Sequence, residues 1–464
     1  MIEFCLLIAC YIRCDSLFNL RQRRYNSDTT DRSMFEKGKK MILEVLDRAG
    51  YSLCRKEDLD KRIEEIACRK KEDIDKRIEV AALMPIRAEH LFSHVMTKGY
   101  PQVQYAFVKQ VEPTANDRAI ARRLLNFYRK CMREKGGGRK PRGDLWGGLQ
   151  TTSHGDFIRL LGKNDPESLA AYLCNMCRHA ATDGFIQGAS VYDQLQASEE
   201  SRQWQASLCV DKLMCLAEAL GCLPRENPEQ GRFGTNLYLA VEDVVSQIEK
   251  EVGMNIAHPP VLGGLFGLDT SRGILDFRYI SGIYSAWRIR QILEGREDVS
   301  VCEIGAGIGF TAHAASRLSI KRYTIFDLPY VAVMTGYYLI KSLPEARIIL
   351  YGEAASKDGA SISLYPYWHF DRTASKCFDL TLNQDSFPEI DVDVVKWYLE
   401  SMTANTKDFF LSINQEGQAQ IVAPRKDQVF VSALLKDRKA YKLTYRFPYW
   451  LREGYTEELY RIVG

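Results

Sequence analysis

The chain has 464 residues, of which 46% are hydrophobic and 27% are charged. A chain of this length exceeds a single typical core, so we expect two or three globular domains and exclude a fibrous or disordered protein. The 63 basic and 60 acidic residues leave a net charge of +3. That charge provides no global field that would demand nucleic acid or an anionic membrane as a partner.

The cysteines and the first residues bear on location and metal binding. Thirteen cysteines are scattered without the spacing of a secreted disulfide framework, so we predict free thiols and a cytoplasmic location. Cys174 and Cys177 lie near His179, but no second ligand pair follows at zinc spacing, and no metal site is predicted. Residues 2–12 are apolar but few and include Glu3, so we expect a packing helix and no membrane span.

The first part of the chain, residues 1–135, is predicted to be a charged α-helical region. Within it, KEDLDKRIE at residues 56–64 returns as KEDIDKRIE at residues 71–79. The repeat distance is close to four helical turns, so the apolar side chains of both copies stay near one face. We expect a solvated helical hairpin or short coiled coil that serves assembly or docking, including formation of a homo-oligomer.

A basic helix and a glycine-rich linker end this region. The helix covers residues 118–135, and GGGRKPRG at residues 136–143 is the predicted linker. Such a pair could contact nucleic acid, but interleaved aromatic residues are missing, so we interpret the helix as a solvated face and expect no nucleic acid partner.

Residues 144–276 show helical spacing and are predicted to form an α-helical cap region. Asp165 followed by Pro166 is a strong helix start, because an N-cap acid and a first-turn proline agree. The glycine-rich residues 261–267 suit a loop at the edge of a substrate site.

A second glycine-rich segment marks a ligand-binding unit. Residues 299–304 are a β-branched run typical of a buried parallel strand, and a helical stretch covers residues 311–318. Gly305, Gly307 and Gly309 stand between them, where a Cβ would block both a tight turn and the approach of a bound molecule. Asp327 ends the next strand, where a carboxylate can accept hydrogen bonds from ribose hydroxyls. This order predicts a nucleoside site; the alternative is a tight loop without a ligand.

The spacing of the glycines separates two classes of nucleoside-binding protein. A dinucleotide-binding loop carries G-x-G-x-x-G, and counting from Gly305 puts Phe310 where its third glycine belongs. The pattern here is E-x-G-x-G-x-G. It resembles the first motif of class I S-adenosylmethionine-dependent methyltransferases, with Glu303 on the strand and Asp327 as the ribose acid.

The remaining sequence alternates strands and helices as a doubly wound sheet does. Further strands are predicted at residues 347–351, 378–382 and 409–413, and residues 441–450 and 456–463 form a closing hairpin with an antiparallel last strand. We therefore predict an α/β fold for residues 277–464, Rossmann-like with a mostly parallel seven-stranded sheet. A helix over residues 277–293 is expected to pack against its first strand.

The region from residue 143 to the end resembles a bacterial family of sugar O-methyltransferases. The likeness rests on five segments: FRYISGIYSAWRIR at 277–290, EIGAGIG at 303–309, YTIFDLP at 323–329, LNQDSFPE at 382–389 and LSINQE at 411–416. It implies S-adenosylmethionine as the methyl donor and a small molecule with a hydroxyl group, such as a sugar, as the acceptor. The cap region would then complete the acceptor side.

The resemblance also implies where the donor lies. Its amino-acid end is expected against the glycine loop, its ribose on Asp327 and its adenine near residues 351–353. The predicted donor-binding residues are Glu303, Gly305, Ala306, Gly307, Gly309, Asp327, Leu328, Asn383 and Gln384.

An alcohol is a poor nucleophile at neutral pH, so a base must accept its proton during transfer. The candidates are Asp385, which follows the fourth strand into the crevice, Glu416, which follows the fifth, and His369 in an aromatic segment. Each has a structural alternative: Asp385 as a helix cap, Glu416 as a loop acid and His369 in a loop against the core.

We therefore predict an S-adenosylmethionine-dependent O-methyltransferase. Two other classes stay open: a non-catalytic scaffold that keeps the fold, and a nicotinamide-dependent dehydrogenase, which the missing third glycine disfavours.

Overall fold

The computed structural model describes residues 95, 98–134, 145–227, 234–256, 259–354, 361–416 and 429–463. The predicted helices before residue 95, the repeat at residues 56–79 and the linker at residues 136–143 lie outside this part. Their roles in assembly and docking stay predictions.

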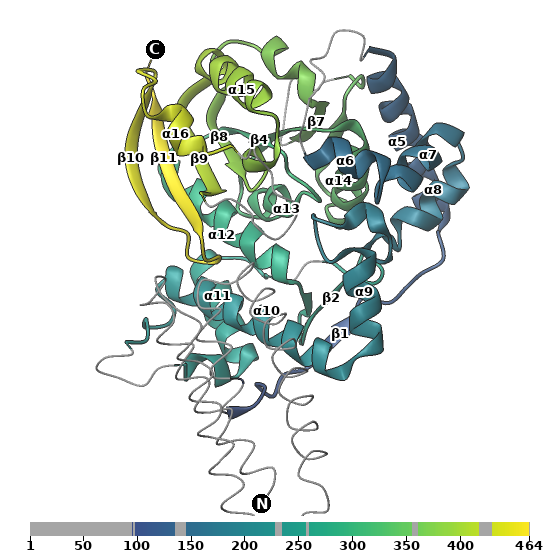
Figure 1. Ribbon diagram of the computed structural model, residues 1–464, viewed down its shortest axis with the longest axis vertical. Helices are drawn as coiled ribbons and strands as arrows, with labels where there is room; N and C mark the ends of the chain where they lie inside the picture. The colour runs from purple at the N-terminus through teal and green to yellow at the C-terminus, as the bar shows by residue number, and fades with distance from the viewer. Residues whose placement is uncertain are drawn as a thin grey trace, which may run out of the picture. The chain divides into compact units, whose positions relative to one another are not determined.

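The described residues form mostly helices up to residue 276, and strands and helices mostly alternate after it (Figure 1). The α-helices are α5 (Ala115–Glu134), α6 (Leu145–Thr151), α7 (Gly155–Lys163), α8 (Pro166–Leu173), α9 (Gly188–Ala197), α10 (Glu199–Ala219), α11 (Val241–Val252), α12 (Phe277–Ile292), α13 (Phe310–Arg317), α14 (Pro329–Ser342), α15 (Val392–Asn405) and α16 (Val431–Leu435). The strands are β1 (Tyr105–Phe107), β2 (Phe266–Thr270), β3 (Gly273–Leu275), β4 (Ser300–Ile304), β5 (Arg322–Asp327), β6 (Arg347–Leu350), β7 (Ser361–Pro366), β8 (Phe378–Gln384), β9 (Thr406–Gln415), β10 (Tyr441–Pro448) and β11 (Tyr455–Ile462). The 3-10 helices are η2 (Met176–Arg178), η3 (Ala180–Thr182), η4 (Asn236–Tyr238), η5 (Tyr367–Arg372) and η6 (Phe387–Glu389).

The larger sheet is mixed and has the strand order β10-β11-β9-β8-β4-β5-β7-β6. Neighbouring strands from β9 to β6 are parallel, and β11 is antiparallel to both β9 and β10. The α/β fold and the closing hairpin agree with the sequence prediction. The predicted number of seven strands does not, because the described residues form eight: β7 inserts between β5 and β6.

Helices cover both faces of the parallel strands. All five residues of β4 are buried, as expected for a central parallel strand with helices above and below it. The α13 and α14 helices lie on one face and α15 on the other (Figure 1). The chain first moves along the sheet from β4 to β5 and later in the opposite direction, past β4 to β8. Because crossovers between parallel strands are right-handed, this reversal of direction places the later helix on the opposite face.

A buried ion pair joins α12 to the closing hairpin. Glu457 on β11 has no exposed side-chain surface, and it accepts hydrogen bonds from Tyr284 at 2.6 Å and from Arg288 at 2.9 Å. Tyr445 on β10 donates to the same carboxylate at 2.8 Å. The carboxylate is thus satisfied from both α12 and β10, which holds the helix against the outer strands.

The cap region contains helices α6 to α11 and strands β2 and β3, and β1 from residues 105–107 pairs with β2 to complete a small antiparallel sheet. The predicted start of α8 is confirmed: Asp165 caps the helix by accepting from the backbone of Glu167 and Ser168, and Pro166 is its first residue. The glycine-rich residues 261–267 differ from the predicted open loop. Leu262 and Leu265 have no exposed surface, and the segment runs into β2, which pairs with β1.

The basic helix α5 packs on the C-terminal part of the chain. Its buried residues include Ile120, Leu124 and Leu125. A Cβ on Gly336 of α14 would lie 2.7 Å from Leu124, so the glycine permits this close approach. Arg123 pairs with Glu353 at 2.6 Å. These contacts place α5 with residues 145–463 and not in a separate region before residue 135.

The described residues lack two features. None of their helices is both long and apolar enough to cross a membrane. Among the described residues, no group of three or more His, Cys, Asp or Glu side chains could hold a metal ion.

Asp117 is predicted to anchor α5. Its buried carboxylate accepts from Tyr337 at 2.8 Å and pairs with Lys341 at 2.8 Å. Burial opposes the charge, but the bonds from Lys341 and Thr114 lower the pKa of Asp117 to about 2. The stabilisation is therefore present above the ordinary pKa of an aspartate and is lost as pH falls toward 2. We expect Asp117→Asn to reduce the free energy of unfolding by about 1–3 kcal/mol in urea denaturation at pH 7.

The matched control for this anchor is Asp298→Asn. Asp298 pairs with Arg322 at 2.8 Å, but its side chain is 64% exposed, so the change should cost less than about 1 kcal/mol. An equal loss in both variants would contradict the anchoring role of Asp117.

Candidate functional site

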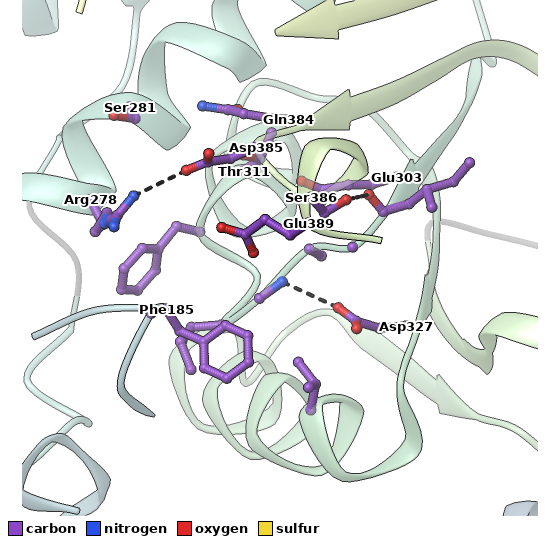
Figure 2. A pocket seen from close by; sticks show the side chains of 18 of the residues that line it. Phe185, Arg278, Ser281, Glu303, Thr311, Asp327, Gln384, Asp385, Ser386 and Glu389 are labelled. Carbon is purple, nitrogen blue, oxygen red and sulfur yellow. Dashed lines mark hydrogen bonds and ion pairs between the residues drawn. The ribbon is translucent and has the colours of Figure 1, made fainter. Parts of the chain in front are cut away.

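A pocket lies at the carboxyl ends of β4, β5 and β8 (Figure 2). At this place the strand order reverses, because β5 and β8 flank β4 on opposite sides. Ligands of open α/β sheets bind at such points. The pocket contains about 1320 Å³ of empty space, counting the part that opens to solvent. A concave site at this edge of the sheet is where a small-molecule ligand is expected to bind.

The glycine loop after β4 forms one wall. Its first residue, Gly305, has φ of +74°, and a Cβ there would lie 2.3 Å from Ser386 Oγ. The backbone N–H of Gly305 donates to Phe326 O at 2.9 Å, which ties the loop to β5. Only glycine satisfies both the positive φ and the close approach of Ser386.

Asp327 lies at the end of β5, beside the loop. Its carboxylate is 8% exposed and accepts from the backbone N–H of Gly307 at 3.2 Å and of Leu328 at 2.7 Å. Burial raises the pKa of Asp327 to about 7, although these backbone bonds and one from Ala306 act in the opposite direction. A ligand whose hydroxyl groups donate hydrogen bonds to this carboxylate would replace the hydrogen bonds from water that burial removes.

Glu303 lies behind the loop, on β4. Its carboxylate is 3% exposed and accepts from the Tyr323 hydroxyl at 2.9 Å. Burial and, to a smaller extent, the neighbouring Asp327 raise the pKa of Glu303 to about 7, and the bond from Tyr323 acts in the opposite direction. The two carboxyl groups therefore share one poorly solvated region.

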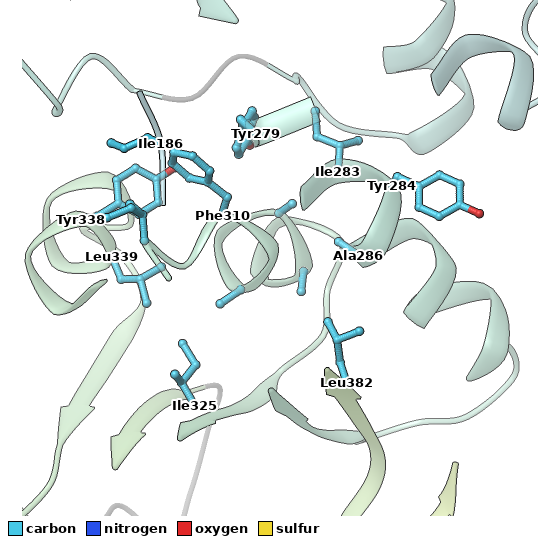
Figure 3. Packing of buried hydrophobic residues seen from close by; sticks show 14 of the residues in the cluster. Ile186, Tyr279, Ile283, Tyr284, Ala286, Phe310, Ile325, Tyr338, Leu339 and Leu382 are labelled. Carbon is cyan, nitrogen blue, oxygen red and sulfur yellow. The ribbon is translucent and has the colours of Figure 1, made fainter. Parts of the chain in front are cut away.

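The loop rests on an aromatic layer between helices (Figure 3). Phe310, the first residue of α13, packs edge-on against Tyr279 of α12 and Tyr338 of α14, with ring centres 5.7 and 5.1 Å apart. All three rings are buried. The residue that occupies the position of a third dinucleotide-loop glycine thus holds the loop in place from behind.

The other end of the pocket is charged. Asp385 accepts from Arg452 at 2.5 Å and from the Tyr455 hydroxyl, and Arg278 lies 3.4 Å from it. Burial would raise the pKa of Asp385, but the guanidinium groups of Arg452 and Arg278 hold it below its usual range. Figure 2 shows Arg278 and Asp385 on the side of the pocket away from Asp327.

Most of the predicted donor-binding residues line this pocket, and two lie behind it. Gly309 is the N-cap of α13, and a Cβ on it would lie 2.8 Å from Thr335, so it serves helix packing. Asn383 is fully buried and donates to Ile304 O at 2.9 Å and to Ser386 at 2.6 Å. The predicted residues that line the pocket are Glu303, Gly305, Ala306, Gly307, Asp327, Leu328 and Gln384.

Of the three proposed bases, the structure brings only Asp385 to the pocket. Glu416 is held among the outer strands by Arg446 and Ser432. His369 lies on η5, with its ring stacked 5.1 Å from that of Tyr365. Because both are engaged elsewhere, we place neither at the reacting atoms.

The expected adenine residues, 351–353, also lie away from the pocket. Strand β7 separates β6 from β5, so the end of β6 is one strand further from the glycine loop than predicted. Glu353 pairs with Arg123 of α5 instead. Tyr367, which follows β7, lines the pocket in their place.

Several lining residues were missed in the sequence prediction. Four of them lie within the segments that carry the family resemblance, so those segments could have indicated them: Arg278, Ser281, Ser386 and Glu389. Two groups carried no sequence signal, because they come from distant segments: Phe185 and Lys212 from the cap, and Tyr449, Arg452 and Tyr455 from the closing hairpin.

Comparisons with known proteins complete the description of the site. Neither a family model nor a curated protein sequence matches the chain. Among solved structures, a SAM dependent methyltransferase from Aquifex aeolicus is similar at 13% identity, over 39% of this chain and 92% of that chain, with a TM-score of 0.27. An S-adenosylmethionine dependent methyltransferase from Mesorhizobium loti is similar at 12% identity, over 38% of this chain and 97% of that chain, with a TM-score of 0.26. At these TM-scores, the likeness does not by itself establish fold or activity.

The raised pKa of Glu303 predicts how stability depends on pH. In the unfolded chain, Glu303 and Asp327 release their protons near their ordinary pKa values, whereas in the folded chain they do so near pH 7. The free energy of unfolding should therefore fall as pH rises from 5 to 8. The amide of Glu303→Gln stays neutral at both pH values. The fall in the free energy of unfolding should therefore be smaller in this variant, by at most on the order of 3 kcal/mol.

Urea denaturation at pH 5 and pH 8 measures this difference. The exposed Glu345→Gln is the control and should keep the pH dependence of the unmodified chain. An unchanged slope in Glu303→Gln would mean that Glu303 is ionised without cost in the folded protein.

Proposed function

We propose that the chain is an S-adenosylmethionine-dependent methyltransferase that methylates a hydroxyl group of a sugar or sugar-containing small molecule. One observation carries the methyltransferase assignment: a glycine-rich loop faces the carboxylate of Asp327 in a pocket at the switch point of the sheet. The sugar acceptor is supported only by the family resemblance in the sequence. The free thiols of the described cysteines are in keeping with the cytoplasm as its location.

The residues of the pocket fit this donor. Gly305 and Gly307 leave backbone groups open to its amino-acid end, and Asp327 offers acceptor oxygens to its ribose hydroxyls. Leu328, Val331 and Tyr398 form an apolar side that suits the adenine. When bound, the sulfonium of S-adenosylmethionine supplies an activated methyl group. The protein then needs mainly to align acceptor and donor and to exclude water.

The charged end of the pocket suits the acceptor. Arg278, Ser281 and Gln384 provide donors there, and Lys212 comes from the cap region. Phe185, also from the cap region, lies against the glycine loop, since a Cβ on Gly307 would lie 3.4 Å from its ring. Hydrogen-bond donors and acceptors at a partly apolar pocket match the mixed surface of a sugar.

Asp385 serves in this proposal as a positioning residue. A carboxylate that is bonded to Arg452 and Tyr455 and close to Arg278 is stabilised in its charged form. It is therefore a poor proton acceptor, and we assign it to holding the two arginines in place.

The two alternative classes make different binding predictions. A nicotinamide-dependent dehydrogenase would bind NADH, although Phe310 occupies the position of the glycine that packs a dinucleotide loop. A non-catalytic scaffold would bind the donor, or nothing, without turnover.

Calorimetric titration of the full chain with S-adenosylhomocysteine and NADH tests the assignment. We expect S-adenosylhomocysteine to bind and NADH not to bind. Asp327→Ala should weaken the binding of S-adenosylhomocysteine by about 1–3 kcal/mol, because the ribose loses its hydrogen-bond acceptor.

The control is Asp408→Ala. Asp408 pairs with Arg296 at 2.6 Å outside the pocket, so its removal should leave the affinity unchanged. Binding of NADH alone would favour the dehydrogenase, and equal affinity in the Asp327→Ala variant would place the ribose elsewhere. If the donor binds, a panel of methyl glycosides is then screened for methyl transfer.

A further inference from the structure

A lysine from the cap region lies at the charged end of the pocket. Lys212 is on α10, outside the large sheet, yet its side chain is only 1% exposed and lines the pocket. Its Nζ donates to Ser281 Oγ at 2.9 Å and lies 3.5 Å from the centre of the Phe277 ring. Among the described residues, the amine donates one hydrogen bond, to Ser281, and it has capacity for a further bond to a ligand.

The surroundings of Lys212 disfavour its positive charge. Burial lowers its pKa well below the usual range of a lysine, and the guanidinium groups of Arg278 and Arg452 lower it further. Three groups act in the opposite direction: the carboxyl of Asp276, at the N-cap of α12, Cys209, on the same helix as Lys212, and the face of the Phe277 ring. Relative to an exposed lysine, these surroundings favour the uncharged amine, whose electron pair can accept a proton.

The position of the amine relative to the donor site follows from its partner. Ser281 lies on the side of the pocket away from Asp327 (Figure 2). Tyr449 also lines the pocket, and its hydroxyl lies 3.5 Å from the amide nitrogen of Gln384. With the ribose on Asp327, Lys212 therefore lies at the end of the pocket that is left for the acceptor.

We propose that Lys212 is a catalytic residue whose Nζ accepts the proton of the acceptor hydroxyl, a role that rests on the proposed function. As the acceptor oxygen forms its bond to the methyl carbon, the carbon–sulfur bond breaks and its electron pair passes to sulfur. The hydroxyl proton passes to Nζ. The ammonium so formed lies near Arg278 and Arg452, which favours release of the proton to solvent.

Competitive labelling of the full chain with acetic anhydride tests this role without a known acceptor. Acetylation of each lysine is measured by mass spectrometry between pH 6 and pH 10, with Lys396 and Lys407 as references, whose side chains are 44% and 49% exposed. An ordinary lysine reacts about tenfold faster for each pH unit over most of this range, because only the neutral amine reacts. We expect Lys212 to react and its rate to level off at least one pH unit below the references.

Two results would overturn the proposal. A rate that rises with pH as the references do would mean that Lys212 is an ammonium near neutral pH. No reaction at any pH would mean that the amine is sealed from the pocket, so no acceptor hydroxyl could reach it. Calorimetry with S-adenosylhomocysteine is run beside the labelling, and absence of binding there counts against the donor assignment and not against the state of Lys212.

Turnover supplies the second readout once a methyl glycoside is methylated. Lys212→Met keeps an unbranched chain over Phe277 but removes the amine, so kcat should fall about 10²–10⁴-fold while the affinity for S-adenosylhomocysteine stays within twofold. Lys212→Arg should not restore kcat, because a guanidinium keeps its proton. In the unmodified enzyme kcat should fall as pH is lowered. Lys407→Met, outside the pocket, is the matched control, and an unchanged kcat in Lys212→Met would overturn the proposal.

Discussion

The bond between Asp327 and the backbone of the glycine loop is the contact on which the rest of the pocket depends. A carboxylate can approach this backbone because no side chain stands between them, and the loop keeps its shape because Gly305 is tied to β5 from the other side. Burial makes both Asp327 and Glu303 costly to ionise. A ligand that donates hydrogen bonds from its hydroxyl groups would offset this cost.

The two ends of the pocket differ in how they are built. The end at Asp327 comes from one continuous segment, a strand, a loop, a helix and the next strand, and its geometry follows from backbone structure. The charged end is assembled from three segments far apart in the chain: Lys212 from the cap, Arg278 from α12 and Arg452 from the closing hairpin. Its geometry therefore depends on tertiary contacts, among them the buried Glu457 that fixes α12 to β11.

This difference explains what the sequence could predict. Residues of the loop and the strand ends were identified because glycine spacing and a terminal acid are local patterns, and Asp165 before Pro166 gave the start of α8 for the same reason. Strand β7 was missed because its six residues are followed at once by an aromatic turn, and the missing strand moved the expected adenine residues away from the pocket. Lys212 has no local sequence pattern that indicates its role. Its burial results from the packing of α10 against α12, which a single lysine in a helical sequence does not predict.

The two outer strands of the large sheet differ in length but share one property: each is closed to further pairing. On β6, Arg123 donates to Ile348 O and Glu353 accepts from Leu350 N, so side chains occupy groups that another strand would need. On β10, a register shift between Leu443 and Tyr445 and the terminal Pro448 interrupt the free edge. The sheet therefore cannot readily grow by adding a strand from a second molecule, and self-association through the described residues would have to use helical or loop surfaces.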